Sequence, residues 1–327
     1  MMMKNECYKK TYPVLGIPLT VITNSEKMAA LVEERYKSWE STPGELVEKV
    51  TPGIIEIYLH PERGALVNID QLEYRVSNAH VTAEGPGIKF SVDRLNNYAE
   101  ATLEPAVLSQ KDYFISAVLD CMVLFLATRN NRVPLHASTI IVNGTALVLY
   151  GQSGSGKSTL SYQLYREGAG ILSESAVYIQ NEGGFRLWGD SQAFNLRPDS
   201  REFFPELNDL KEVRQPGNKF RIRLAISNHN GWGSRHFHFS GDAILIFLKP
   251  IRDSKSYLVR MDKSEAMKKL RKEREPGYNL DNEFDPVLSS FPFKDIFTLH
   301  SGSDLSYKTG LLYKLTGGEI EHGKSSV

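Results

Sequence analysis

The chain has 327 residues, enough for about two folding units, and its 41% apolar and 24% charged residues are typical of a globular protein. The 39 basic and 39 acidic side chains cancel. Because non-specific binding of nucleic acid requires a basic excess, we expect no nucleic-acid partner. The two cysteines, Cys7 and Cys121, are too few for a disulfide framework and suit a reducing environment, so we expect a cytoplasmic protein.

No segment predicts insertion into a membrane. The N-terminus lacks the apolar stretch of a secretory signal. The most apolar run, Tyr113 to Thr128, is too short to cross a bilayer and carries Asp120 in its middle. We therefore predict a buried helix at 112–129 and no membrane partner.

The first third of the chain predicts a β-rich module. Residues 12–23 are apolar and β-branched and predict a strand, whereas 27–39 predicts a helix. From 53 to 103, short β-rich runs alternate with clusters of Pro and Gly. We assign residues 1–110 to this N-terminal module, which shows no catalytic motif and is a candidate for substrate recognition.

The remaining residues, 111–327, predict an α/β catalytic domain. Asn143-Gly144 between two apolar runs predicts a tight hairpin of strands 139–142 and 145–150. A helical pattern then ends at Gly168, a typical C-terminal cap. Further β-rich runs predict strands at 171–180, 185–190, 220–227, 243–250 and 257–261.

The hairpin leads directly into the pattern G-x-x-x-x-G-K-[ST]. Its glycines let backbone N–H groups curve around phosphates, and the helix that follows adds its positive end. In such a loop Lys157 pairs with the outer phosphates and Ser158 binds Mg²⁺. The pattern predicts an ATP or GTP site formed by Gly151, Gln152, Ser153, Gly154, Ser155, Gly156, Lys157, Ser158 and Thr159.

Two further side chains are expected at the same edge of the sheet. His136 comes just before the hairpin, and Ser173-Glu174-Ser175, within the β-rich run 171–180, ends the next strand after the helix. Because ligands of α/β sheets bind at strand ends, we expect His136 and Glu174 to converge on the terminal phosphate. A carboxylate at this place can accept a hydroxyl proton or hold Mg²⁺.

The stretch from Leu135 to Ile179 resembles the catalytic domain of the HPr serine kinase/phosphorylase superfamily, which has a His before a hairpin, the hairpin directly before the loop, and an acidic pair after the helix. The resemblance implies a P-loop domain with a mixed sheet, His136 as the active-site His, and Glu174 as the general base. Ser175 stands where the family has a second, metal-binding aspartate. Metal binding would then rely on Ser158 and Glu174, or on another acid such as Asp190.

Cationic residues downstream are candidates for stabilising the phosphates. The family's signature in this region is absent, and Arg197 stands in its place. Lys219 and Arg221 alternate along a predicted strand, so their side chains would share one face. Such a pattern serves phosphoryl transfer in some enzymes but is equally typical of a solvated strand face.

A β-rich module ahead of such a domain is similar to the kinases encoded beside ribosomally made peptides, and lasso-peptide kinases, which phosphorylate the C-terminal serine of a precursor, are the nearest comparison. The resemblance implies ATP- and Mg²⁺-dependent phosphorylation of a serine on a peptide or small protein, with His136, Lys157 and Glu174 as catalytic residues. Two alternatives remain open: a nucleotide-hydrolysing switch protein and a small-molecule kinase. A homo-oligomer is compatible with the sequence.

Overall fold

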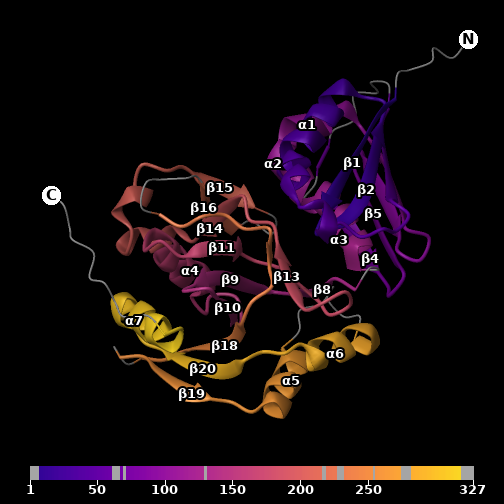
Figure 1. Cartoon of the computed structure of the whole chain (residues 1–327). Coiled ribbons are helices and arrows are strands. Elements are labelled where there is room, and N and C mark those ends of the chain that lie inside the picture. Colours follow the sequence, from indigo (N-terminus) through magenta and orange to yellow (C-terminus); the bar gives the residue numbers. More distant parts are fainter. Residues whose placement is uncertain are drawn as a thin grey trace, which may run out of the picture. The chain divides into compact units, whose positions relative to one another are not determined.

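The computed structural model describes residues 7–60, 67–68, 71–128, 131–215, 219–226, 232–252, 255–273 and 281–317. The chain divides into two compact units, one of Met1–Arg132 with Gln215–Lys219 and one of Val133–Arg214 with Phe220–Val327. Each unit combines helices with a mixed sheet, which confirms the α/β class (Figure 1).

The first unit is built on a seven-stranded sheet in the order β1-β2-β3-β7-β6-β5-β4. Strands β2, β3 and β7 are parallel, and the other neighbours are antiparallel. The strands are β1 (Tyr8–Val14), β2 (Ile17–Thr23), β3 (Gly53–Leu59), β4 (Glu73–Val76), β5 (His80–Gly85), β6 (Ile88–Asp93) and β7 (Tyr98–Leu103). The predicted β-rich runs at 53–60, 73–77 and 88–92 thus form strands, while the run at 65–70 lies largely outside the described residues.

Helices cover one face of this sheet. Buried and exposed residues alternate along β3, β5 and β6, as expected for strands with one packed face. α1 (Glu26–Tyr36) contacts β1 and β2, and α3 (Asp120–Ala127) contacts β3, β6 and β7. The apolar segment that we assigned to the catalytic domain therefore packs in the first unit, where α2 (Lys111–Phe114) and a π-helical turn (Ile115–Leu119) precede α3.

The expectation of a single strand at 12–23 is wrong. This segment is part of a hairpin, because Leu15 and Gly16 adopt positive φ angles of 53° and 75° and reverse the chain. The predicted helix at 27–39 forms as α1 and passes into a 3-10 turn at Lys37–Ser41. Ser25 caps α1 by accepting a hydrogen bond from the backbone N–H of Met28.

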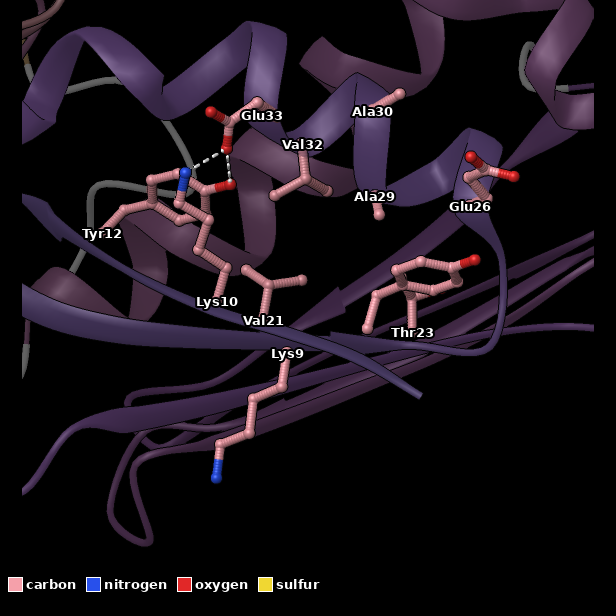
Figure 2. A pocket seen from close by; sticks show the side chains of 11 residues that line it. Lys9, Lys10, Tyr12, Val21, Thr23, Glu26, Ala29, Ala30, Val32 and Glu33 are labelled. Carbon is pink, nitrogen blue, oxygen red and sulfur yellow. Dashed lines mark hydrogen bonds and ion pairs between the residues drawn. The ribbon is translucent and has the colours of Figure 1, made fainter. Parts of the chain in front are cut away.

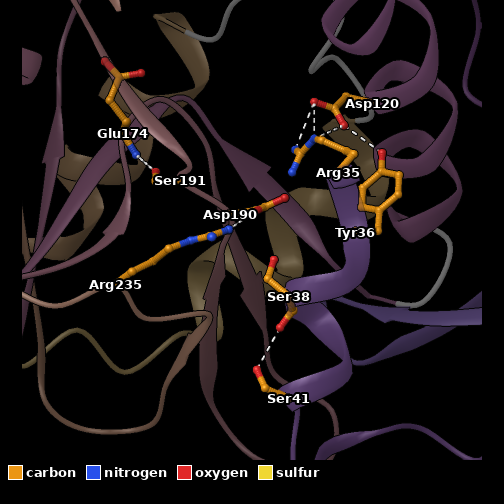
Figure 3. Close-up of polar contacts among 9 residues, drawn as sticks. All are labelled: Arg35, Tyr36, Ser38, Ser41, Asp120, Glu174, Asp190, Ser191 and Arg235. Carbon is orange, nitrogen blue, oxygen red and sulfur yellow. Dashed lines mark hydrogen bonds and ion pairs between the residues drawn. The ribbon is translucent and has the colours of Figure 1, made fainter. Parts of the chain in front are cut away.

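Asp120 ties α3 to α1. Its carboxylate accepts hydrogen bonds from Arg35 Nε at 2.9 Å and Arg35 Nη2 at 3.0 Å, and from the Tyr36 hydroxyl at 2.7 Å (Figure 3). The Arg35 side chain is only 8% exposed, so the pair neutralises a charge that is removed from water. Among the described residues, none of the helices has both the length and the apolar character that a bilayer crossing requires.

We predict that Asp120→Ala destabilises the protein by about 3–5 kcal/mol, because it leaves the Arg35 guanidinium buried without its counter-charge. Urea denaturation followed by circular dichroism measures the loss. Glu84→Ala removes one partner of the exposed Lys89–Glu84 pair, 3.9 Å apart, and should change stability by less than about 1 kcal/mol. Equal effects of the two substitutions would contradict this role of Asp120.

The second unit contains three sheets. A six-stranded sheet has the order β11-β9-β10-β18-β20-β19, a four-stranded sheet β17-β13-β12-β8 and a three-stranded sheet β14-β16-β15. Their strands are β8 (Val133–Leu135), β9 (Ala137–Val142), β10 (Thr145–Tyr150), β11 (Gly170–Ser173), β12 (Val177–Gln180), β13 (Arg186–Gly189), β14 (Ala193–Leu196), β15 (Glu212–Gln215), β16 (Lys219–Ala225), β17 (His238–Phe239), β18 (Ala243–Pro250), β19 (Tyr257–Arg260) and β20 (Asp295–Ser301).

The six-stranded sheet is buried on both faces. Leu147 and Leu149 of β10 belong to the core that includes helices α4 (Lys157–Arg166) and α7 (Leu305–Leu315). Ala146 and Val148 belong to the core that includes α5 (Lys263–Lys272) and α6 (Asp281–Ser290). All six residues of β10 are therefore buried, as in the central strand of an α/β sheet (Figure 1).

Most local predictions for this unit are confirmed. Asn143 and Gly144 adopt φ angles of 48° and 73° and close the predicted hairpin. Gly168, with a φ of 101°, follows the end of α4. The β-rich run 171–180 forms two strands in different sheets, β11 and β12, and β11 ends at Ser173, where the strand after the helix is expected to end.

Candidate active site

Two neighbouring segments cross between the four-stranded and the six-stranded sheet at the same place, in opposite directions along the chain. On one side of the crossing Leu135 of β8 pairs with Val177 of β12, and on the other Thr139 of β9 pairs with Ser173 of β11. Both His136 and Glu174 therefore lie at this seam between the sheets. The structure brings these two predicted residues to one end of the six-stranded sheet, and their catalytic roles stay predictions.

Two buried serines hold the crossing segments together. The Ser138 hydroxyl donates to the backbone oxygen of Ser173, and the Ser173 hydroxyl donates to that of Ala137, each at 3.0 Å. The Ser138 hydroxyl also lies 2.6 Å from the Ser161 hydroxyl of α4. These bonds tie the seam to the helix that follows the glycine-rich loop.

The glycine-rich loop leaves the sheet beside the seam. β10 ends at Tyr150, which pairs with Ala137, so Gly151 and His136 extend from the same end of two adjacent strands. Gly154 and Gly156 have φ angles of 88° and 93°, a left-handed conformation that favours glycine. α4 begins at the next residue, so its unpaired backbone N–H groups face the loop.

The loop concentrates polar donors in a buried space. Lys157 is 8% exposed, and its Nζ donates to the backbone oxygen of Gly151 at 2.5 Å and to that of Gln152 at 3.4 Å. The buried Ser155 hydroxyl has no hydrogen-bond partner within the described part of the chain. An ammonium group, a free hydroxyl and a helix N-terminus together suit an anionic group such as phosphate.

Glu174 faces the first turn of α4. Its Oε1 accepts a hydrogen bond from the Ser158 hydroxyl at 2.6 Å. Its backbone N–H donates to Ser191 Oγ (Figure 3). The residue is only 7% exposed, and this burial raises the pKa of its carboxyl group. Hydrogen bonds from Ser158 and Asn195 and the charge of Lys157 act in the opposite direction.

Ser158 and Glu174 carry oxygen atoms of the kind that Mg²⁺ prefers as ligands, and Mg²⁺ binding there stays a prediction. Magnesium prefers oxygen ligands and usually takes one or two from the protein, with the others from water and substrate phosphates. Asp190, the alternative acid, is 5% exposed and forms an ion pair with Arg235 at 2.7 Å (Figure 3). Ser175 is exposed. In the described ranges, no group of three or more His, Cys, Asp or Glu residues is arranged to hold a metal.

The predicted cations differ in their relation to the loop. The Arg197 guanidinium lies against Gly154, where an added Cβ would be 3.0 Å from Nη2. Arg221 precedes the residues of β16 that pair with β14, and its Nη1 donates to the backbone oxygen of Phe220 at 2.9 Å. Lys219 is exposed and belongs to the first unit. The phosphate-stabilising role of all three cations stays a prediction.

Ser191 and Asn195 also shape the site, although they belong to no motif that the sequence displays. Ser191 precedes β14 and Asn195 lies within it, so both contact Glu174 from a third segment of the chain. Single polar residues beside an apolar run are common, so no local signal distinguishes them. Only the folded chain shows that they surround a buried carboxylate.

Comparison with known proteins identifies no family for this chain. No protein-family model matches it, and no curated protein matches it. Among solved structures it is similar to the Hpr(Ser) kinase/phosphatase from Coxiella burnetii, with 9% identity and a TM-score of 0.28 over 56% of this chain and 93% of that chain. A TM-score this low carries no argument about fold or activity.

We predict that Lys157→Ala weakens nucleotide binding by about 1.5–3 kcal/mol, which is about tenfold or more in Kd, because it removes a charge-assisted contact. Isothermal titration with ATP and Mg²⁺ measures the change. Lys49→Ala, at an exposed position of the first unit, serves as the control and should bind like the wild type. Equal ATP affinity of wild type and Lys157→Ala would show that the loop does not bind phosphate.

Proposed function

We propose that this protein is a kinase that transfers the terminal phosphoryl group of ATP to a serine hydroxyl of a peptide or small protein. The observation that carries the proposal is the contact between Ser158 and Glu174 at the start of α4. It joins a hydroxyl and a buried carboxylate beside a glycine-rich loop that holds Lys157. This set of groups serves both phosphate binding and proton transfer.

The proposed reaction assigns a role to each group. Backbone N–H groups of the loop and Lys157 hold the phosphates, and Ser158 and Glu174 hold Mg²⁺, which neutralises phosphate charge when bound. The acceptor oxygen forms a bond to the terminal phosphorus as the bond to the bridging oxygen breaks, so that ADP leaves. Glu174 accepts the hydroxyl proton, and His136, at the seam, contacts the transferred group.

The serine acceptor is supported by the resemblance of residues 135–179 to a superfamily of serine kinases. A lasso-type precursor with a C-terminal serine is the specific acceptor that we propose. The described elements of the second unit show no further motif for a sugar or nucleoside acceptor. A peptide acceptor would also give the first unit a role in substrate recognition.

We predict that Glu174→Gln lowers phosphoryl transfer by about 10²–10⁴-fold while ATP still binds, because the amide keeps the size of the side chain but cannot accept the proton. Single-turnover assays and titration with ATP separate the two steps. Glu182→Gln changes an exposed carboxylate in the turn after β12 and should leave transfer unchanged. Near-normal turnover of Glu174→Gln would place the base elsewhere.

The acceptor is tested by incubating the protein with ATP, Mg²⁺ and precursor peptides that end in serine. Mass spectrometry should detect one phosphate on the peptide and none when that serine is replaced by alanine. ATP consumption should depend on the peptide. Equally fast consumption without any peptide would instead favour a nucleotide-hydrolysing switch, and phosphorylation of small hydroxyl compounds alone would favour a small-molecule kinase.

A further inference from the structure

The outer edge of β1 is open for pairing. In the described part of the chain, β1 pairs with β2 alone and lies at the end of the seven-stranded sheet. Pro13 pairs with Pro18, and because neither proline has an N–H, this pair cannot be a hydrogen-bonded one. Bonded and non-bonded pairs alternate, so the backbone groups of Lys9 and Thr11 also point away from β2.

A side-chain distance supports this assignment of bonded and non-bonded pairs between β1 and β2. Opposed side chains approach most closely at non-bonded pairs, and the hydroxyls of Thr11 and Thr20 lie 2.7 Å apart. Lys9 and Thr11 therefore offer N–H and C=O groups to a further strand, and Pro13 ends this run because it lacks a donor.

A cavity of about 330 Å³ lies beside this open edge, between β1 and α1. Figure 2 shows Val21 of β2 facing Val32 and Ala29 of α1 across it. The small side chains of Ala29 and Ala30 leave space next to the strand. A strand added to β1 would turn every second side chain toward the helix, so an apolar side chain would enter the cavity.

Two lysines and two glutamates line the cavity, and one of the carboxylates is in no ion pair with a described residue. Lys10 is neutralised by Glu33 at 2.6 Å and also pairs with Glu40 at 2.8 Å. Lys9 belongs to the lining, but its side chain points away from the cavity in Figure 2. Glu26, in the first turn of α1, lines the cavity and has no ion pair within the described ranges. A basic side chain is the complementary partner for Glu26.

We propose that the groove between β1 and α1 binds an extended peptide segment as an additional strand, with an apolar side chain in the cavity and a basic side chain at Glu26. The backbone groups of Lys9 and Thr11 supply the affinity, and the cavity and Glu26 supply the selectivity. This inference names the peptide partner that the proposed kinase requires, and rests on the proposed function for that role only.

The test measures binding of two fluorescein-labelled heptapeptides, TVTKTVT and TVTETVT, to the full chain by fluorescence anisotropy without nucleotide. In each peptide the valines and the central charged residue lie on one face of an extended strand, so a valine can enter the cavity while the charge approaches Glu26. TVTKTVT should bind saturably and about two- to fivefold more tightly than TVTETVT, because the contact with Glu26 is exposed. Glu26→Lys should reverse that order. Absence of saturable binding of TVTKTVT, or an unchanged order in Glu26→Lys, would overturn the proposal.

Two further variants test the contributions of the strand edge and of the cavity to binding separately, and a third serves as their control. Thr11→Pro removes one outward N–H and should weaken binding of TVTKTVT about three- to tenfold. Ala30→Trp fills the cavity from an exposed position and should weaken it about tenfold or more. Lys27→Trp places the same side chain on α1 outside the cavity lining and should bind like the wild type. Wild-type affinity of both Thr11→Pro and Ala30→Trp would overturn the groove as the binding site.

The outcome is independent of the kinase reaction. If phosphorylation of a serine peptide is observed while the groove variants bind normally, the groove proposal fails and the kinase stands. If the groove binds TVTKTVT as expected while no transfer to any peptide occurs, the kinase proposal fails and the groove proposal is supported. Circular dichroism melting curves of each variant verify that the loss of binding does not come from unfolding.

Discussion

The candidate site depends on the seam at which two strand pairs cross from one sheet into another. Regular pairing on each side, between Leu135 and Val177 and between Thr139 and Ser173, fixes the backbone to within a residue or two. At the crossing itself, His136 and Glu174 lie between strands rather than within them. Their backbone conformations are therefore not restricted to that of a β-strand. A functional side chain at such a point is held by rigid elements and still reaches out of the sheet.

The electrostatics of the site follow from its burial. Glu174 and Lys157 are both less than 10% exposed, and burial alone would disfavour both charges. Hydrogen bonds from Ser158 and Asn195 to the carboxylate, and from the ammonium to the loop oxygens, offset part of that cost. A phosphate and a divalent cation would provide the remaining counter-charges, which is the physical basis of the nucleotide proposal.

In the first unit, polar contacts hold helix α1 beside the open edge of β1. Asp120 of α3 holds Arg35 and Tyr36 at the C-terminal end of α1, while Glu33 binds Lys10 and Tyr12 of the hairpin. α1 is thus connected to its neighbour helix on one side and to β1 on the other. Ala29 and Ala30, which precede Glu33 on α1, leave space beside β1 because their side chains are small.

The sequence by itself determined the local features whose chemistry is contained in a few adjacent residues. These are the hairpin at Asn143-Gly144, the glycine-rich loop before α4, and the buried helical segment that carries Asp120. Only the tertiary structure decided that 8–23 is a hairpin, that the two parts of 171–180 join different sheets, and that Ser191 and Asn195 surround the Glu174 carboxylate. Local motifs follow from backbone geometry and turn chemistry. The sheet that a strand joins and the groups that surround a buried charge depend on packing between segments far apart in the chain. The residues of an apolar run do not specify which strand it will pair with.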